Sequence, residues 1–295
     1  MERLVDKKTE KKRLLIFLMF SFGMTWVIFF LAIGKGMIRD SSDTAMEQFV
    51  GLGMLMPFAA NLITRKLTKE GFAMTGTDSL LLGIHFKNGK WKYYIFALLI
   101  PWLYLECNYS LQLLFAPDAY DTGIAQSTGM GNGVLIAFPL ISISSATILS
   151  FAALGEEEGW RGYMMPKLIH IMGFKKALLV GGVIWGFWHA PLTCIGHNFG
   201  TDYPGFPYVG ILMMCLMCTL TGILLTYVTM KTESIWPAVF LHAVNNAGPS
   251  VLKFYVNEDV VIEKLLHPIM IWFFLLIPVA VVDVLILFSI RKMKG

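Results

Sequence analysis

The stretch GVLIAFPLISISSATILSFAALGEEEGWRG, residues 133–162, indicates how this chain folds. It opens with an apolar run long enough to cross a lipid bilayer and then reaches Glu156, Glu157 and Glu158. Carboxylates in or beside a membrane span are energetically costly and rare, so they are candidates for function. The alternative is that the charged cluster ends the helix and anchors it among the lipid headgroups.

The composition of the whole chain is typical of an integral membrane protein. Its 295 residues are 56% hydrophobic and 15% charged, whereas soluble domains carry about 25% charged residues. The basic residues cluster at the ends of apolar runs, so the net charge of +4 does not indicate nucleic-acid binding. Cys215 and Cys218 form a C-x-x-C pattern, which is compatible with redox or metal chemistry. We interpret all four cysteines as small packing residues, because each lies in an apolar segment.

Apolar runs of about 20 residues predict eight membrane spans. When the N-terminus is placed in the cytosol, every Lys and Arg lies on the cytosolic side except Lys35, Arg39, Lys253 and Lys264. This asymmetry favours a cytosolic location for both termini. The predicted spans are 13–33, 47–64, 91–115, 133–155, 177–195, 207–229, 234–251 and 267–290.

We therefore predict an all-α fold: a polytopic membrane helix bundle of about eight transmembrane helices, with a membrane-embedded cavity open toward the cytosol. Short loops and the lack of tandem repeats favour a single domain over residues 1–295. Its motif-bearing core lies at about 133–251. In this orientation the run GEEEGWRG lies at the cytosolic end of the fourth span.

Helical spacing separates the three glutamates. An α-helix has 3.6 residues per turn, so Glu157 and Arg161 share a face and are expected to form an ion pair. Glu156 lies on a different face, beside Trp160, where an apolar environment suits a general base. Glu158 points elsewhere.

Two later spans carry further polar side chains. His189 lies deep in the fifth span, in GGVIWGFWHAP (181–191), while His242 and Asn246 share a face of the seventh, in WPAVFLHAVNNAG (236–248). Hydrogen bonding between helices would explain these residues without any catalysis. They also compose a hydrolytic set, in which Glu156 and His189 deprotonate a water and the seventh span donates to an oxyanion. A zinc ion is the other possibility, held by Glu156, His189 and His242.

The motifs, in this order on separate spans, resemble those of the CAAX protease and bacteriocin-processing family of intramembrane endopeptidases, also called the Abi family. The resemblance covers residues 150–250, roughly, within the eight-span topology. Trp185 stands where the commonest pattern has Phe, which we expect to affect packing rather than chemistry, and Glu158 stands where an apolar residue is more usual. The motifs are Glu156-Glu157-x-x-x-Arg161, Trp185-x-x-x-His189 and His242-x-x-x-Asn246.

The resemblance implies an endopeptidase that cleaves a peptide bond near the cytosolic membrane face. Glu156 would activate the water with help from His189, and Arg161 would hold Glu157. His242 and Asn246 would stabilise the oxyanion. The sequence has no HExxH motif and asparagine is a poor zinc ligand, which favours a glutamate-dependent mechanism over a metal-dependent one.

The resemblance also implies a peptide or protein substrate, either lipid-modified or bacteriocin-like, and a location in the lipid bilayer. The motif variant is similar to the bacterial members, which favours a prokaryotic cell membrane. The alternative function is a non-catalytic immunity or transport protein that binds an ion or a bacteriocin peptide. A transporter would be expected to show inverted repeats with paired broken helices, and the sequence shows none.

Overall fold

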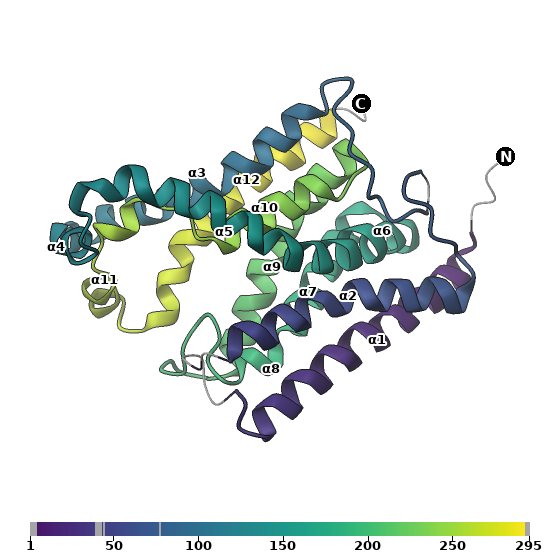
Figure 1. The fold of residues 1–295 in the computed structure, drawn as a ribbon, viewed down its shortest axis with the longest axis horizontal. Helices are drawn as coiled ribbons and strands as arrows, with labels where there is room; N and C mark the ends of the chain where they lie inside the picture. The colour runs from purple at the N-terminus through teal and green to yellow at the C-terminus, as the bar shows by residue number, and fades with distance from the viewer. Residues whose placement is uncertain (1–4, 39–42, 44, 77, 293–295) are drawn as a thin grey trace.

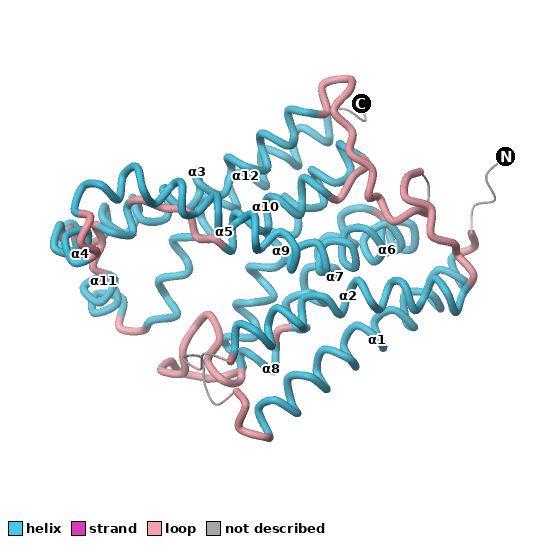
Figure 2. The backbone as a smooth tube through the Cα atoms, viewed as in Figure 1, coloured by secondary structure: helices cyan, strands magenta, loops and turns pink. Residues whose placement is uncertain are grey.

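The computed structural model describes residues 5–38, 43, 45–76 and 78–292. Within this part of the chain it contains helices and turns but no β-strand, so the all-α prediction is confirmed. A helix lies at each of the eight predicted spans (Figure 1, Figure 2). These helices are α1 (Lys7–Gly34), α2 (Met46–Thr68), α3 (Trp91–Phe115), α5 (Val134–Glu157), α7 (Phe174–Trp188), α9 (Tyr208–Thr232), α10 (Trp236–Asn246) and α12 (Trp272–Lys292).

The other elements of the described chain are short and connect these helices. They are η1 (Pro117–Ala119), α4 (Thr122–Ser127), η2 (Gly131–Gly133), η3 (Glu158–Met164), α6 (Met165–Met172), α8 (Ala190–Thr193), η4 (Leu252–Phe254), α11 (Glu258–Leu265) and η5 (Pro268–Ile271). The run from η2 through α5 and η3 to α6 is continuous, so the predicted fourth span and the glutamate cluster belong to one long helical segment.

Five segments of the described chain are long and apolar enough to cross a bilayer by themselves. The structure therefore has a helix at each of the eight predicted spans, but three of these helices are too short or too polar to count as bilayer-crossing by themselves. α3 has 25 residues but carries polar side chains such as Asn108 and Gln112. α7 has 15 residues and α10 has 11, fewer than the about 20 that a span requires.

The two short helices both end at predicted site residues. His189 follows the last residue of α7, and Asn246 is the last residue of α10. Pro191 comes two residues after His189, and Pro249 comes three residues after Asn246. Proline lacks the backbone N–H of a continuing helix and restricts the residue before it. The sequence thus ends α7 beside the half-buried His189 and α10 at the exposed Asn246.

The helices pack around the segment that carries the glutamates. α2 packs between α1 and α5, and α10 packs against α5, α3 and α9. α7 lies along α9, while α12 covers α3 and α9. In Figure 1, α1 begins and α12 ends on the same side of the bundle, together with α6 and the loop between α2 and α3.

Glycines allow the site-bearing helices to approach their neighbours closely. A Cβ atom on Gly155 would lie 2.5 Å from the carbonyl oxygen of Met54 in α2, and one on Gly186 would lie 2.3 Å from the Cα atom of Cys215 in α9. Any larger residue at these two positions would collide with backbone. The contacts place α5 directly against α2 and α7 directly against α9, as is common for small residues in membrane bundles.

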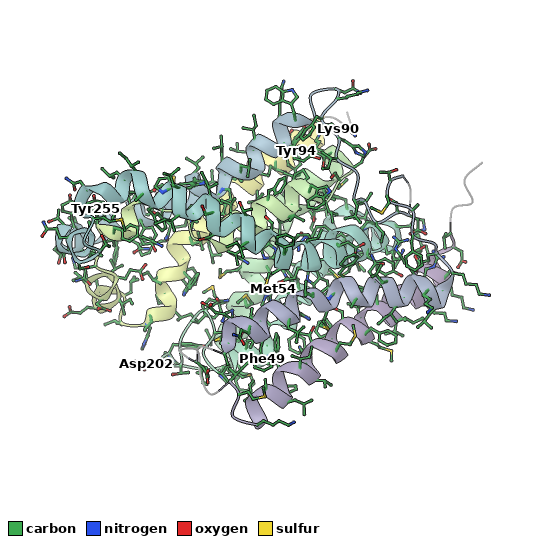
Figure 3. All side chains as sticks on the ribbon, viewed as in Figure 1. Phe49, Met54, Lys90, Tyr94, Asp202 and Tyr255 are labelled. Atoms are coloured by element: carbon green, nitrogen blue, oxygen red, sulfur yellow. The ribbon has the colours of Figure 1, made fainter. Side chains whose placement is uncertain are left out.

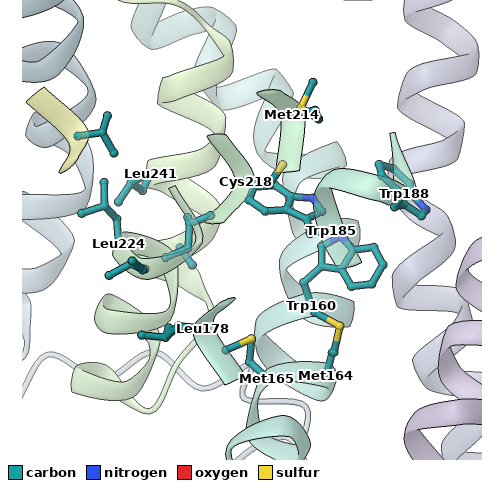
Figure 4. Packing of buried hydrophobic residues seen from close by; sticks show 14 of the residues in the cluster. Trp160, Met164, Met165, Leu178, Trp185, Trp188, Met214, Cys218, Leu224 and Leu241 are labelled. Atoms are coloured by element: carbon teal, nitrogen blue, oxygen red, sulfur yellow. The ribbon is translucent and has the colours of Figure 1, made fainter. Parts of the chain in front are cut away.

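The molecule has an apolar interior and an apolar outer surface. Figure 4 shows the interior, where Trp160, Trp185 and Cys218 lie in one buried cluster. On the outside, large apolar side chains such as Ile148 and Phe151 are more than 70% exposed. Side chains of this kind cover the long helices in Figure 3, as expected for a surface that faces lipid.

A buried cluster of charged side chains joins α1, α6 and the loop after α2. Nζ of Lys167 lies 2.7 Å from Oε2 of Glu70 and 3.4 Å from Oε2 of Glu10. Nη1 of Arg13 lies 2.8 Å from Glu10 and 3.6 Å from Glu70. Burial raises the pKa of Glu70, but the Lys167 ammonium and the hydrogen bonds from Thr68 and Tyr163 together hold the pKa below its usual value. The cluster fixes the loop after α2 against two helices.

Candidate active site

The glutamate cluster lies where the α-helix changes to a wider turn. Glu156 and Glu157 are the last residues of α5, and Glu158 begins η3, which is a π-helix. At its end the N–H of Met165 donates to the carbonyl oxygen of Trp160, five residues earlier. π-Turns are rare and are frequent at functional sites. The sequence interpretation assumed regular α-helical spacing, and residues 158–164 do not follow it.

All three glutamates are buried. Their exposed fractions are 2% for Glu156 and 0% for Glu157 and Glu158. The alternative that the cluster anchors a helix end in the headgroups is therefore wrong. Buried carboxylates require partners, because removing a charge from water is unfavourable unless hydrogen bonds or opposite charges replace the water.

Glu156 is bonded by two indole groups. Its Oε2 accepts hydrogen bonds from Nε1 of Trp160 at 3.2 Å and from Nε1 of Trp185 at 2.6 Å. Both donors act on the same oxygen, which leaves Oε1 without a donor among the described side chains. The carboxylate is thus held at one oxygen and can use the other as a base.

The bond from Trp185 corrects the expectation that Trp in place of Phe affects packing alone. A phenyl ring has no N–H and could not donate to Glu156. The indole ring also contacts the other two motifs: the guanidinium carbon of Arg161 lies 4.0 Å from its centroid, and the His242 ring lies 5.6 Å away. Trp185 is therefore in contact with residues of α5, η3 and α10 at once.

Glu157 joins α5 to α10 and to η3. Its Oε1 accepts from Nη1 of Arg161 at 3.1 Å and from Nδ1 of His242 at 2.7 Å. The pairing of Glu157 with Arg161 that helical spacing predicts is present. Both side chains are buried, with exposed fractions of 0% and 3%, so this ion pair is far more consequential than one at the surface.

His189 lies at the end of α7 with one ring nitrogen already bonded. Its Nδ1 lies 2.9 Å from the carbonyl oxygen of Trp185. A carbonyl oxygen accepts hydrogen bonds, so Nδ1 carries the hydrogen and Nε2 of the neutral ring presents a lone pair. The ring packs edge-on against Trp188 at 4.8 Å. These contacts orient His189 as an acceptor.

Asn246 is exposed at the end of α10, one helical turn beyond the buried His242. Its Oδ1 accepts from Nδ2 of Asn245 at 3.2 Å. Oδ1 of Asn245 in turn accepts from the hydroxyl of Tyr104 on α3 at 2.5 Å. The sequence interpretation missed Tyr104, because nothing in the local pattern of α3 marks it as a neighbour of α10.

Glu158 points away from Glu156 toward α2, in line with its expected different direction. Its Oε1 accepts from Nδ2 of Asn61 at 2.6 Å, and Oδ1 of Asn61 accepts from Nε of Arg65 at 2.9 Å. The sequence interpretation missed these partners as well. The available signal was the spacing of Asn61 and Arg65, which are four residues apart, with Asn61 inside the predicted span 47–64 and Arg65 directly after it.

A cavity of about 420 Å³ opens beside the site. It lies between α6, the last turns of α9 and the loop after α2, where the basic residues gather. Its lining includes Arg161 at the buried end and Glu233 at the exposed end, but not Glu156, His189 or His242. The cavity therefore approaches the glutamate cluster from the side of Arg161.

The possible zinc ligands do not form a metal-binding set. Among the described residues, no group of three or more His, Cys, Asp or Glu side chains is arranged to hold a metal ion. The bonds of Nδ1 of His242 to Glu157 and of Nδ1 of His189 to a carbonyl oxygen leave Nε2 of each ring free, so zinc is disfavoured by the placement of the three side chains and not by these bonds. The arrangement of Glu156, His189 and His242 does not fit zinc, and the chemistry below uses side chains alone.

The fold and this buried cluster define a helical membrane protein with a polar site inside the bundle. Residues 138–248 match the family model described as Type II CAAX prenyl endopeptidase Rce1-like. Over 113 residues, the chain is 28% identical to CAAX prenyl protease 2 of Methanococcus maripaludis. That alignment covers 38% of this chain and 41% of the relative, so it spans less than half of either protein.

Over this region, the two matches confirm the resemblance to the CAAX protease and bacteriocin-processing family that the motifs indicate. The region matched by the family model contains the glutamate segment, α7, α9 and α10, so all three motifs lie within it. It leaves out α1, α2, α3 and α12.

Proposed function

We propose that this chain is an intramembrane endopeptidase of the CAAX type, which hydrolyses a peptide bond near the cytosolic membrane face. The observation that carries the proposal is a pair of contacts between helices. Trp185 on α7 donates a hydrogen bond to Glu156, and His242 on α10 is hydrogen-bonded to the adjacent Glu157. Three motifs that are far apart in the sequence thus share one buried cluster.

Glu156 and His189 activate the attacking water. Oε1 of Glu156 takes a proton from the water as the water oxygen attacks the carbonyl carbon of the scissile bond. Nε2 of His189 accepts a second hydrogen bond from the same water and orients it. The proton held by Glu156 then passes to the leaving nitrogen, and the C–N bond breaks to give a carboxylic acid and an amine. The acid proton passes to the amine, so the final products are a carboxylate and an ammonium group.

His242 and Asn246 stabilise the negative charge that develops on the carbonyl oxygen. Nδ1 of His242 donates to Glu157, so Nε2 can donate to the oxyanion when the ring carries both hydrogens. The Glu157 carboxylate balances the resulting positive charge, and Arg161 keeps that carboxylate in place. Asn246 supplies a second donor from its amide nitrogen.

The orientation of the bundle follows from its charges. Arg13, Arg65, Lys90, Lys167 and Lys231 lie at the end that holds α6 and the loop after α2. We place this end in the cytosol, together with both termini, since basic residues concentrate on that side. The cavity beside Arg161 then opens to the cytosol, and the protein lies in a prokaryotic cell membrane.

The substrate is a protein or peptide with a lipid-modified C-terminus, as the name of the matched CAAX prenyl protease suggests. The test uses purified protein in liposomes and a quenched fluorescent peptide with a prenylated CAAX end. We expect turnover by the unmodified chain and none by Glu156→Gln. The matched control, Glu158→Gln, replaces a neighbouring buried carboxyl group that contacts α2, and we expect it to retain turnover.

The same assay separates the proposal from a non-catalytic immunity or transport protein. Such a protein would bind the peptide without cleaving it, and Glu156→Gln would leave the peptide intact to the same extent as the unmodified chain. Cleavage that survives in Glu156→Gln would reject the mechanism.

A further inference from the structure

A chain of hydrogen bonds leads from α3 to the amide of Asn246. The hydroxyl of Tyr104 donates to Oδ1 of Asn245 at 2.5 Å, and Nδ2 of Asn245 donates to Oδ1 of Asn246 at 3.2 Å. Tyr104 is 2% exposed, so the start of the chain is inside the bundle, whereas Asn246 is exposed at its end. α3 lies outside the region matched by the family model.

The direction of these bonds follows from the burial of Tyr104. A buried hydroxyl hydrogen without an acceptor destabilises a protein, because the group has lost its hydrogen bond to water and gained none in return. In the structure, the Tyr104 hydroxyl donates its hydrogen bond to Oδ1 of Asn245. If the Asn245 amide were turned around, its nitrogen would face Tyr104 and the phenolic hydrogen would be left unbonded. Tyr104 therefore fixes the orientation of Asn245, and Asn245 fixes that of Asn246.

The consequence is an uncommitted donor at the end of α10. Because Oδ1 of Asn246 is bonded to Asn245, its Nδ2 is the amide atom that remains for a substrate. Asn246 lies one turn after His242 on the same face of the helix. His242 bonds to Glu157, so this face is turned toward α5 and the glutamates.

α3 also holds the segment that follows Asn246. The carboxylate of Glu106 accepts from the backbone N–H of Val251 at 2.5 Å and of Leu252 at 3.3 Å, and from the hydroxyl of Ser250 at 3.1 Å. Glu106 lies two residues after Tyr104 on α3. The end of α10 is therefore bonded to α3 on both sides of Asn246.

We propose that Tyr104 and Asn245 are positioning residues that turn the amide N–H group of Asn246 toward the oxyanion. This inference rests on the proposed peptidase function. It adds a positioning residue, Tyr104, from a helix outside the region that the family model matches. We call the hydrogen bonds from Tyr104 through Asn245 to Asn246 the relay. The relay orients the Asn246 donor before the substrate binds, and oxyanion donors accelerate a reaction most when they are oriented in advance.

The test compares Tyr104→Phe with Tyr109→Phe, which removes a hydroxyl from the same helix outside the relay. With the prenylated peptide in liposomes, we expect Tyr104→Phe to lower kcat about 10- to 100-fold, which is less than the loss of about 100- to 1,000-fold for a deleted oxyanion donor, because the donor is misplaced and not removed. KM should stay within about twofold, since the donor acts in the transition state. Tyr109→Phe should leave both values unchanged.

A double-variant cycle separates positioning from a general loss of packing. If Tyr104 acts through Asn246, then Tyr104→Phe should cause no further loss of kcat in an Asn246→Ala background. A full additional loss in that background would overturn the proposal, as would unchanged kcat in the single variant.

A structural readout tests the relay independently of catalysis. In a high-resolution structure of Tyr104→Phe, we expect the contact of Asn245 with Asn246 to be lost or reversed. An unchanged contact would overturn the relay even if the protein proved inactive. Failure of the relay can be distinguished from failure of the proposed peptidase function. If the peptidase function were wrong, the unmodified chain itself would show no turnover that depends on Glu156.

Discussion

The indole N–H of Trp185 donates to Oε2 of Glu156 at 2.6 Å, and this bond joins the second motif to the first. Trp160 donates to the same oxygen at 3.2 Å. Two donors on one oxygen hold the carboxylate in a single orientation, with Oε1 available to a water. The residue that the sequence comparison treats as a packing variant is thus a direct partner of the proposed base.

We expect Trp185→Phe to lower kcat about 10- to 100-fold, because a hydrogen bond to a charged group contributes about 1.5–3 kcal/mol. The aromatic contact with Arg161 is retained in this variant, so the melting temperature in detergent should change little. Trp160→Phe is the matched control and should have a smaller effect, since its bond is longer. Equal losses in both variants would indicate a packing defect instead.

We expect His189→Ala to abolish cleavage of the prenylated peptide while the protein remains folded. The ring orients the attacking water, and losing a side chain with this role typically lowers the rate about 100- to 10,000-fold. His267→Ala, which changes an exposed histidine outside the site, is the control. Turnover by His189→Ala at the level of this control would exclude His189 from the mechanism.

Arg161→Ala should destabilise the folded protein by about 3–5 kcal/mol, because it leaves the buried Glu157 carboxylate without its cation. The measurement is thermal unfolding in detergent, with Lys176→Ala as an exposed control. Adding Glu157→Gln to Arg161→Ala should recover part of the loss, since no buried charge then remains unpaired at this position. An unchanged melting temperature in Arg161→Ala would show that the pair does not stabilise the bundle.

The buried cluster around Glu70 should make the protein sensitive to acid. Since the pKa of Glu70 is held below its usual value of 4.5, its stabilising effect is present above about pH 4.5 and is lost as the pH falls through the lowered pKa. Glu70→Gln should therefore lower the melting temperature at pH 7, and the difference should shrink toward pH 3. Glu47→Gln, at an exposed position, should show neither effect.

A melting-temperature deficit that does not depend on pH would contradict this prediction. A deficit in Glu70→Gln that stays constant between pH 7 and pH 3 would mean that the charge of Glu70 does not contribute. The loss would then have to come from the shape of the side chain or from its bond to the Tyr163 hydroxyl, which lies 2.6 Å from Oε1.

The helical membrane fold, the positions of the helices and the motifs of the site could all be predicted from the sequence. This was possible because long apolar runs and residues four apart are local features of the chain. The pair of Glu157 with Arg161 is an example, since both residues lie on one helical segment. The match to residues 138–248 agrees with motifs read from the same segment.

Which side chains meet across helices could not be predicted in this way. Trp185 reaches Glu156 over 29 positions of sequence, His242 reaches Glu157 over 85, and Tyr104 reaches Asn245 over 141. Such contacts depend on how closely helices approach and how each is rotated, which glycines such as Gly155 and the π-helix after Glu157 control. A pattern of local spacing carries no information on that rotation, because the packing of the whole bundle sets it.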